Sequence, residues 1–213
     1  MTGCDMWGPL PDELFDLSHS LKELFIAYNR FSGTIPTTIG TMEKLTDFYA
    51  YGNELSGSLP SEIGKMKKLE NLVLADNRLT GQIPEEVSSM PSLQLFSIFN
   101  KDENTPGLTG TLPTFKHAPQ LTDLYLYGNS ISGSIPQDFL SSSNNIFLVI
   151  LSHNKVRMLP LNSIEGGVFE TVSYSLILYV IFLGKTKCRF LGLFRRNWLM
   201  GSHPFRWSWK GMR

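Results

Sequence analysis

Cysteine is scarce in this chain of 213 residues, which contains only Cys4 and Cys188. Two cysteines are too few for a four-ligand zinc site, and their positions in different regions do not favour a disulfide between them. The Asn-x-Ser/Thr sequence that marks an N-glycosylation site is also missing. This absence argues against a heavily glycosylated extracellular protein.

The motifs of common catalytic sites are absent as well. The sequence contains no GxSxG nucleophile elbow, GxxxxGK[ST] phosphate loop, GxGxxG dinucleotide motif or HExxH zinc motif. The four histidines are scattered through the chain at His19, His117, His153 and His203. We therefore predict a protein that is not an enzyme, with no catalytic residue, no cofactor and no metal site.

The net charge is zero, but the charge is unevenly distributed. Residues 1–160 carry 11 Lys and Arg against 17 Asp and Glu, whereas residues 161–213 carry 8 against 2. An acidic segment therefore precedes a basic one. We expect the two segments to differ in structure.

A repeat with a period of 24 residues organises the first of these segments. Its clearest copy is Leu69 to Pro84, LENLVLADNRLTGQIP, and the same spacing begins at Leu21 and Leu45. Apolar residues alternate at Leu72 and Leu74, which predicts a short strand with one buried face. A unit this small must stack on its neighbours to bury that face, so the strands should pair in parallel.

The pattern LxxLxLxxNxLxGxIP resembles the leucine-rich repeat, and its GxIP half resembles the plant-type class of receptor-like proteins and polygalacturonase inhibitors. The resemblance implies an α/β-type repeat solenoid of about six repeats, a right-handed superhelix with a parallel β-sheet on its concave face. It also implies a structural ladder of buried asparagines where the chain leaves each strand. These asparagines are Asn29, Asn53, Asn77, Asn129 and Asn154. The recurrent Gly and Pro that follow are expected to form turns.

The array is expected to occupy residues 1–160, with a partial first repeat at 4–20 in which Cys4 holds the asparagine position. The fourth repeat, from Leu93, is interrupted by the insertion FNKDENTPG at 99–107. Its alternating Asn100, Asp102 and Asn104 resemble the start of a calcium loop, but the expected glycine and closing Glu are missing. A solvated loop is the better interpretation.

The outward strand positions form columns across the expected concave face, and aromatic residues are frequent in them. Exposed aromatic side chains provide a large contact area at a small entropic cost. Asp47 and Asp123 lie beside pairs of tyrosines and could bind a cation or a sugar hydroxyl. The predicted ligand-binding residues are Phe25, Asp47, Tyr49, Tyr51, Phe99, Asp123, Tyr125 and Tyr127. The alternative is that these rings only pack on one another across the sheet.

Residues 161–213 form a basic, aromatic tail without repeats, which contains the apolar run TVSYSLILYVIFLG at 171–184. The run is shorter than the roughly 20 residues of a membrane span. Basic residues follow it, so a membrane anchor with the repeats outside is one interpretation. A cap on the end of the solenoid and an incorrectly translated segment are the others.

These features predict a non-catalytic, receptor-like recognition module that binds a protein, peptide or glycan on the concave face. An acidic array with aromatic rather than basic columns argues against nucleic acid as a partner. We expect a membrane-associated or extracellular protein, although no signal peptide is present in this chain. The alternatives are a soluble inhibitor or scaffold of the same fold, or the sensing fragment of a receptor-like kinase.

Overall fold

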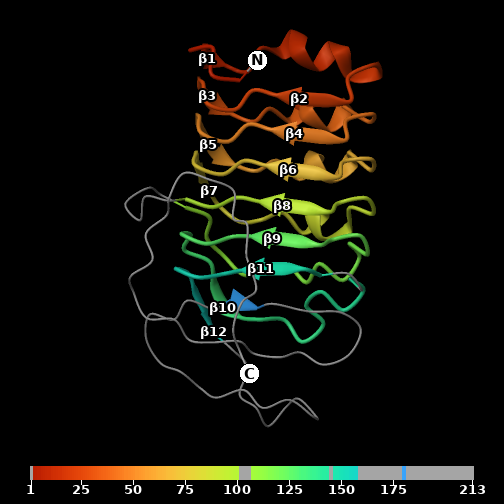
Figure 1. The fold of residues 1–213 in the computed structure, drawn as a ribbon, viewed down its shortest axis with the longest axis vertical. Coiled ribbons are helices and arrows are strands. Elements are labelled where there is room, and N and C mark those ends of the chain that lie inside the picture. Colours follow the sequence, from red (N-terminus) through yellow and green to blue (C-terminus); the bar gives the residue numbers. More distant parts are fainter. Residues whose placement is uncertain (1, 101–106, 144–145, 158–178, 181–213) are drawn as a thin grey trace, which may run out of the picture.

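The computed structural model describes residues 2–100, 107–143, 146–157 and 179–180. Successive repeats are stacked along the long axis of the molecule, and their strands run side by side (Figure 1). The predicted repeat solenoid is therefore confirmed. Its stacking direction follows from the sequence, because each short unit can bury its apolar face only against the units before and after it.

The principal sheet has seven strands in the order β13-β11-β9-β8-β6-β4-β2. Six strands come from successive repeats and pair in parallel, whereas β13 comes from the apolar run 171–184 and is antiparallel to β11. The strands are β2 (Glu23–Phe25), β4 (Asp47–Tyr49), β6 (Asn71–Val73), β8 (Leu95–Ser97), β9 (Asp123–Tyr125), β11 (Leu148–Ile150) and β13 (Tyr179–Val180). The equivalent residues of successive repeats are therefore adjacent across the sheet.

A second, four-stranded sheet runs along another side of the stack in the order β1-β3-β5-β7. Its strands are β1 (Trp7–Pro9), β3 (Arg30–Thr34), β5 (Glu54–Ser58) and β7 (Arg78–Thr80), and β10 (Ser132–Ser134) pairs with β12 (Lys155–Arg157) further along. The expectation that the recurrent glycines lie only in turns was wrong. Gly33 belongs to β3 and Gly57 to β5, because the stacked segments after each asparagine satisfy their peptide groups by pairing with one another.

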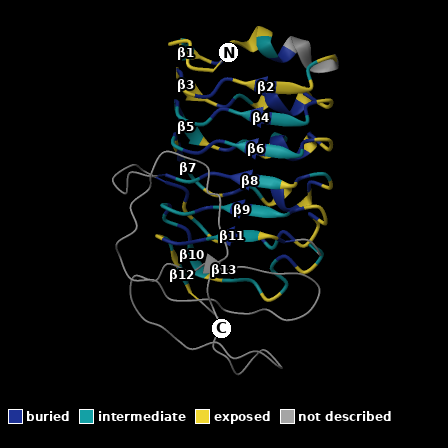
Figure 2. Ribbon diagram, in the orientation of Figure 1, coloured by how far each residue is buried: buried dark blue, intermediate teal, exposed yellow. Residues whose placement is uncertain are grey.

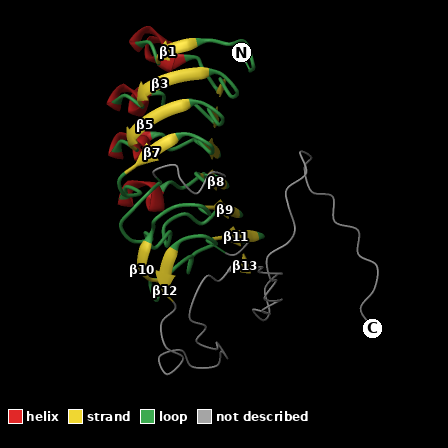
Figure 3. Ribbon diagram, turned by 90° about the vertical axis from the view of Figure 1, so that its left-hand side faces the viewer, coloured by secondary structure: helices red, strands yellow, loops and turns green. Residues whose placement is uncertain are grey.

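Short 3-10 helices return the chain on the side opposite the principal sheet (Figure 3). They are η1 (Asp12–His19), η2 (Thr37–Thr41), η3 (Ser61–Lys65) and η4 (Glu85–Ser89). Pro36, Pro60 and Pro84 immediately precede the last three helices in extended conformation. The fixed φ angle of proline therefore sets the direction in which each return segment starts.

The core lies between the principal sheet and the return segments, and it is continuous from repeat to repeat (Figure 2). Apolar residues of the strands and of the return segments are completely buried, for example Leu72, Ile63 and Met66. Burying each such side chain contributes about 1.5–3 kcal/mol to folding. The regular spacing of these residues is thus the main stabilising feature of the stack.

The asparagines after the strands bind peptide groups of two successive turns. Asn77 accepts a hydrogen bond from the peptide nitrogen of Leu55 at 3.0 Å and donates to the carbonyl oxygens of Ala50 at 2.9 Å and Leu74 at 3.0 Å. Asn53, Asn129 and Asn154 make the same three kinds of bond in their own repeats. These turns are buried, so water cannot reach their peptide groups. The asparagine amides supply the hydrogen-bond partners of these groups instead.

The fourth repeat departs from this arrangement at Asn100. This residue is buried, and its side-chain nitrogen donates to the side-chain oxygen of Asn129 at 3.3 Å. The sequence interpretation placed Asn100 in a solvated insertion, which was wrong for this residue. The other candidate calcium ligands, Asp102 and Asn104, lie outside the described residues.

The predicted tail at 161–213 lies outside the described residues except for Tyr179–Val180. These two residues belong to the apolar run 171–184 and form β13 at the end of the principal sheet. The boundary at residue 160 also lies outside the described part of the chain. Within that part, the structure has no helix of sufficient length and hydrophobicity to cross a bilayer.

Candidate binding face

The strand residues that point away from the core form three columns across the principal sheet, which we call the open sheet face. The register pairs Asp47 with Asn71, Leu95 and Asp123 in the first column, and Tyr49 with Val73, Ser97 and Tyr125 in the second. The third column follows the strands and contains Tyr51, Ala75, Phe99 and Tyr127, whose carbonyl oxygens continue the ladder. All eight residues predicted to bind a ligand therefore lie on one face.

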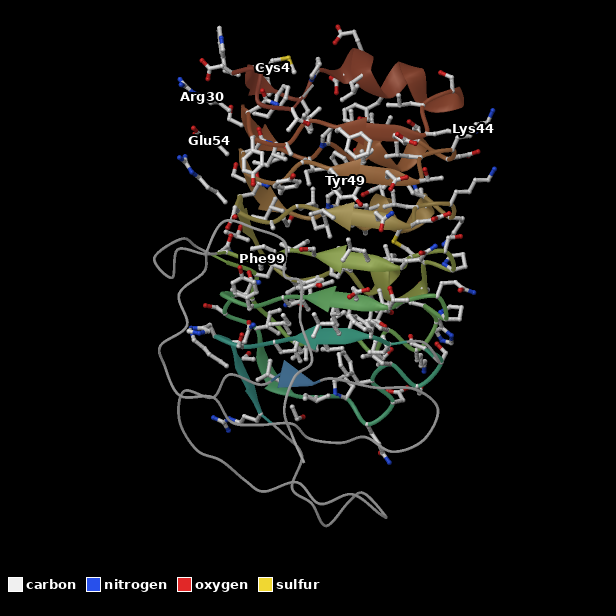
Figure 4. All side chains as sticks on the ribbon, viewed as in Figure 1. Cys4, Arg30, Lys44, Tyr49, Glu54 and Phe99 are labelled. Atoms are coloured by element: carbon white, nitrogen blue, oxygen red, sulfur yellow. The ribbon has the colours of Figure 1, made fainter. Side chains whose placement is uncertain are left out.

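Aromatic rings of neighbouring repeats contact one another on the open sheet face. Phe25 stacks on Tyr49 with ring centres 5.0 Å apart, and Phe99 stacks on Tyr127 at 4.3 Å. Figure 4 labels Tyr49, on β4, and Phe99, which follows β8 near the middle of the sheet. The packing alternative therefore accounts for part of the pattern. The stacked rings still have solvent access, since Phe25 is exposed and the other three are half-buried.

Several small residues expected to point outward are buried instead. Ala27, Ala75, Ser97 and Ser152 each have 4% or less of their surface exposed. A short side chain on a sheet is shielded by longer neighbours in the same column and across the strands. The accessible part of the open sheet face is thus divided into two aromatic regions. Val73, Ala75 and Ser97 separate the regions.

Asp47 and Asp123 occupy equivalent positions and are both held by neighbouring groups. The hydroxyl of the preceding threonine donates to each carboxylate at 2.7 Å, from Thr46 to Asp47 and from Thr122 to Asp123. The side-chain nitrogen of Asn71 also donates to Asp47 at 2.7 Å. A carboxylate has about four acceptor positions, so these bonds orient the aspartates and leave acceptor capacity for a ligand.

The tyrosines beside these aspartates lie in a negatively charged environment. Burial raises the pKa of Tyr125, and the charge of Asp123 and a hydrogen bond to it raise it further. Burial also raises the pKa of Tyr49, with smaller contributions from the charges of Asp47 and Tyr51. Both hydroxyls are therefore neutral at physiological pH. Each tyrosine presents an uncharged ring beside a carboxylate.

Tyr28 belongs to this aromatic region, although the sequence interpretation missed it. Its side chain is 58% exposed and packs edge-on against Tyr51, with ring centres 4.9 Å apart. Tyr28 has a φ of 52°, a backbone conformation in which large residues are uncommon. The signal in the sequence was that tyrosine holds the position occupied by glycine in Gly52 and Gly128.

Within the part of the chain that the structure describes, no three His, Cys, Asp or Glu side chains are grouped so that they could hold a metal ion. His153 is exposed beyond the end of β11, and Cys4 is exposed near the N-terminal end of the stack. The peptide nitrogen of Cys4 donates to the side-chain oxygen of Asn29 at 3.1 Å. Cys188 lies outside the described residues.

The comparisons with known proteins agree with this architecture. The family model described as Leucine Rich Repeat matches residues 20–42, 68–90 and 120–142. A comparison with curated protein sequences gave no match. The chain belongs to the plant-type leucine-rich repeat proteins and resembles the ectodomains of plant receptors.

Three solved structures illustrate the resemblance. The first is the Arabidopsis receptor kinase HAESA in complex with the peptide hormone IDA and the co-receptor SERK1, with 30% identity and a TM-score of 0.67 over 76% of this chain. The second is the ectodomain of GASSHO1/SCHENGEN3 from Arabidopsis thaliana in complex with CASPARIAN STRIP INTEGRITY FACTOR 2, with 35% identity and a TM-score of 0.66 over 72% of this chain.

The third is the ectodomain of the receptor kinase SOBIR1 from Arabidopsis thaliana, with 31% identity and a TM-score of 0.55 over 63% of this chain. The chain spans 26% of the HAESA structure and 18% of the GASSHO1/SCHENGEN3 structure, but 72% of the SOBIR1 ectodomain. It therefore matches only a short part of the HAESA and GASSHO1/SCHENGEN3 structures.

Proposed function

We propose that this protein is a non-catalytic, receptor-like recognition module that binds a protein or peptide on the open sheet face, which the family resemblance makes the concave one. The observation that carries the proposal is the pair of aromatic regions on that face, each with an aspartate at its edge. Rings of this kind are typical of binding hot spots. Two similar receptor structures are complexes, one with the peptide hormone IDA and one with CASPARIAN STRIP INTEGRITY FACTOR 2, which supports the same class of partner.

The proposal concerns a face whose residues differ from those of an ordinary soluble surface. Lys and Arg are absent from its three columns, and apolar rings occupy positions that solvent would favour for polar residues. A grouped set of exposed rings indicates an interaction surface more strongly than isolated exposed residues do. A glycan, whose rings also stack on tyrosine, is the second candidate ligand because Asp47 and Asp123 could accept hydrogen bonds from its hydroxyls.

The test is the simultaneous replacement of Tyr49, Tyr51, Tyr125 and Tyr127 by alanine. We expect the variant to lose capture of peptides that the unaltered protein selects from a random display library. Its circular dichroism spectrum should remain that of the folded array, because all four side chains lie outside the core. Trp7→Ala is the matched control, since Trp7 is 82% exposed but belongs to β1 in the other sheet.

Unchanged peptide capture by the folded quadruple variant would disprove binding on this face. A glycan array probed with the same two proteins would then decide whether the aromatic regions bind sugars instead. If neither peptides nor glycans depend on the tyrosines, the soluble scaffold alternative is favoured.

We also propose that the protein acts at a membrane or outside the cell. The run 171–184 is the candidate anchor, and the pairing of its residues Tyr179–Val180 with β11 favours the competing interpretation, a cap on the end of the solenoid. The support is the resemblance to receptor ectodomains and the basic residues that follow the run, such as Lys185, Lys187 and Arg189. An alkaline wash of membranes from the source cells tests the anchor. Retention of the protein, with recovery of peptides from 195–213 by mass spectrometry, is the expected result, whereas release would favour the inhibitor or scaffold.

A further inference from the structure

Two of the repeats present the same residues to solvent. Residues 46–53 read TDFYAYGN and residues 122–129 read TDLYLYGN, which we call the N-terminal station and the C-terminal station. They differ at only two positions, Phe48 against Leu124 and Ala50 against Leu126, and all four of these side chains are buried. Every position of the motif that faces solvent is identical. Thus the core residues differ between the stations and the open-face residues do not.

The register places the two stations in line with each other. Asp47 and Asp123 belong to one column, and Tyr49 and Tyr125 belong to the next. The strand order β4, β6, β8, β9 separates them by three strand spacings. At about 4.8 Å per spacing, equivalent atoms of the two stations are about 14 Å apart.

Each station combines a carboxylate with neutral aromatic rings. Tyr49 and Tyr125 each lie close enough to their own aspartate for its charge to act on the hydroxyl. A carboxylate binds a guanidinium or ammonium group through charge-assisted hydrogen bonds, and the face of a tyrosine ring attracts the same cation. The charged residues in the three columns are Glu23, Asp47 and Asp123, which are all acidic.

The segment between the stations suits a ligand that crosses the strands. In the second column the intervening residues are Val73 and Ser97, whose side chains are short, whereas in the third column they are Ala75 and Phe99. An extended chain that follows the second column therefore meets no large ring between Tyr49 and Tyr125. A fully extended peptide advances about 3.3–3.6 Å per residue, so four residues also span about 14 Å.

From this repeated geometry we propose that the ligand is an extended basic peptide with two arginines four residues apart, one seated at each station. The inference rests on the proposed function, since it specifies the peptide that the open sheet face recognises. Two identical stations bind two identical groups, and their separation sets the spacing of those groups along the ligand. Apolar residues of the peptide would contact Phe25 beyond the N-terminal station and Phe99 between the two stations.

The test is a series of synthetic peptides with two arginines separated by one to five neutral residues, measured against the full chain by fluorescence anisotropy at low ionic strength. We expect the tightest binding for the peptide with three intervening residues, Arg-x-x-x-Arg. Asp47→Asn and Asp123→Asn should each weaken that peptide about tenfold, which corresponds to about 1.4 kcal/mol. Either substitution should also abolish the preference for one spacing of the two arginines, because the remaining station binds only one of them.

Glu23→Gln is the matched control, because Glu23 is an acid in the same column that belongs to neither station. It should keep the preference for Arg-x-x-x-Arg. Equal binding at all spacings, or a preference that survives both aspartate substitutions, would overturn the inference. If library peptides without paired arginines bind and are lost in the tyrosine variant, the inference fails and the proposed function stands. If no peptide binds, both fail.

Discussion

The two stations show how the same short sequence acquires different contacts in different repeats. In the N-terminal station, Tyr49 stacks on Phe25 and Tyr51 packs edge-on against Tyr28. In the C-terminal station the second tyrosine, Tyr127, makes the stacked contact instead, with Phe99. The motif determines at which strand position, and on which face of the sheet, each side chain lies. The neighbouring repeats decide which ring it meets.

The equivalent aspartates and glycines of the two stations also have different neighbours. Asp47 receives a hydrogen bond from Asn71, the next residue in its column, whereas the next residue after Asp123 is Leu148, whose side chain has no group to donate. Gly52 lies under the ring of Tyr28, whereas Gly128 lies against the backbone of Asn100. The C-terminal station is therefore coupled to the irregular fourth repeat. The N-terminal station adjoins regular repeats on both sides.

The largest expected difference between the stations concerns these glycines. Both have a positive φ, 67° in Gly52 and 68° in Gly128, which costs any other residue about 1–2 kcal/mol. A Cβ on Gly128 would lie 2.0 Å from the carbonyl oxygen of Asn100, which is backbone, whereas one on Gly52 would lie 2.8 Å from the ring of Tyr28. We expect Gly128→Ala to lower the free energy of unfolding by about 3–5 kcal/mol, since backbone crowding adds to the cost of the φ angle.

Gly52→Ala should cost only about 1–2 kcal/mol, because the Tyr28 ring is exposed and can move aside. Urea denaturation of both variants measures the difference. Equal losses would show that the close approach of Asn100 to Gly128 is unimportant.

An intermediate difference is expected for the asparagines that end the stations. Asn53→Ala leaves the buried peptide nitrogen of Phe31 without its acceptor and removes one of the two amide donors to each of the carbonyl oxygens of Ile26 and Ala50, which should cost about 2 kcal/mol. Asn129→Ala removes the equivalent bonds and also the contact with the Asn100 side chain, so a further loss of about 1 kcal/mol is expected.

Thermal and urea unfolding of the two asparagine variants give the comparison. Asn71→Ala serves as the control, because Asn71 is half-buried and bonds only to the Asp47 side chain. A larger loss for Asn53→Ala than for Asn129→Ala would contradict the extra coupling at the C-terminal station.

The smallest effect concerns the tyrosine hydroxyls. Since folding raises the pKa of Tyr125, the folded state retains a proton that the unfolded state loses. The corresponding stability is complete below the unfolded pKa of about 10 and is lost as the pH rises through the folded pKa. Asp123→Asn should lower the pKa of Tyr125, because it removes the negative charge and replaces the carboxylate by a weaker, neutral amide acceptor.

Asp47→Asn should lower the pKa of Tyr49 by less, because the charge of Asp47 acts there without a hydrogen bond to Tyr49. Phenolate absorbance during an alkaline titration of each variant measures both shifts. A larger downward shift for Tyr49 than for Tyr125 would contradict the assignment of the hydrogen bond to the Asp123–Tyr125 pair.

Much of the fold was predictable because the same strand pattern recurs in every repeat. The spacing of Leu69, Leu72 and Leu74 predicts a strand with one buried face, and recurrence at 24 residues predicts parallel stacking. The second sheet was not predicted. Residues such as Arg30–Thr34 contain a glycine, which suggests a turn when a single repeat is considered, and they become a strand only when neighbouring repeats offer partners.

The candidate face was predictable in position but not in detail. Alternation along each strand places Tyr49 and Tyr51 on the solvent side, as the structure shows. It cannot reveal that Ser97 and Ser152 are shielded, because burial depends on the length of neighbouring side chains rather than on direction alone. Tyr28 was missed for a related reason, since its exposure follows from a positive φ just after the strand.

A local pattern repeated at a constant period is enough to specify the stacking of the repeats, the direction of each strand side chain and the shared residues of the two stations. Packing between repeats sets which rings stack, which aspartate is bound by an asparagine, and how closely Gly128 approaches Asn100. These contacts join residues of different repeats. Their geometry depends on the offset between stacked units, which a repeated pattern does not specify.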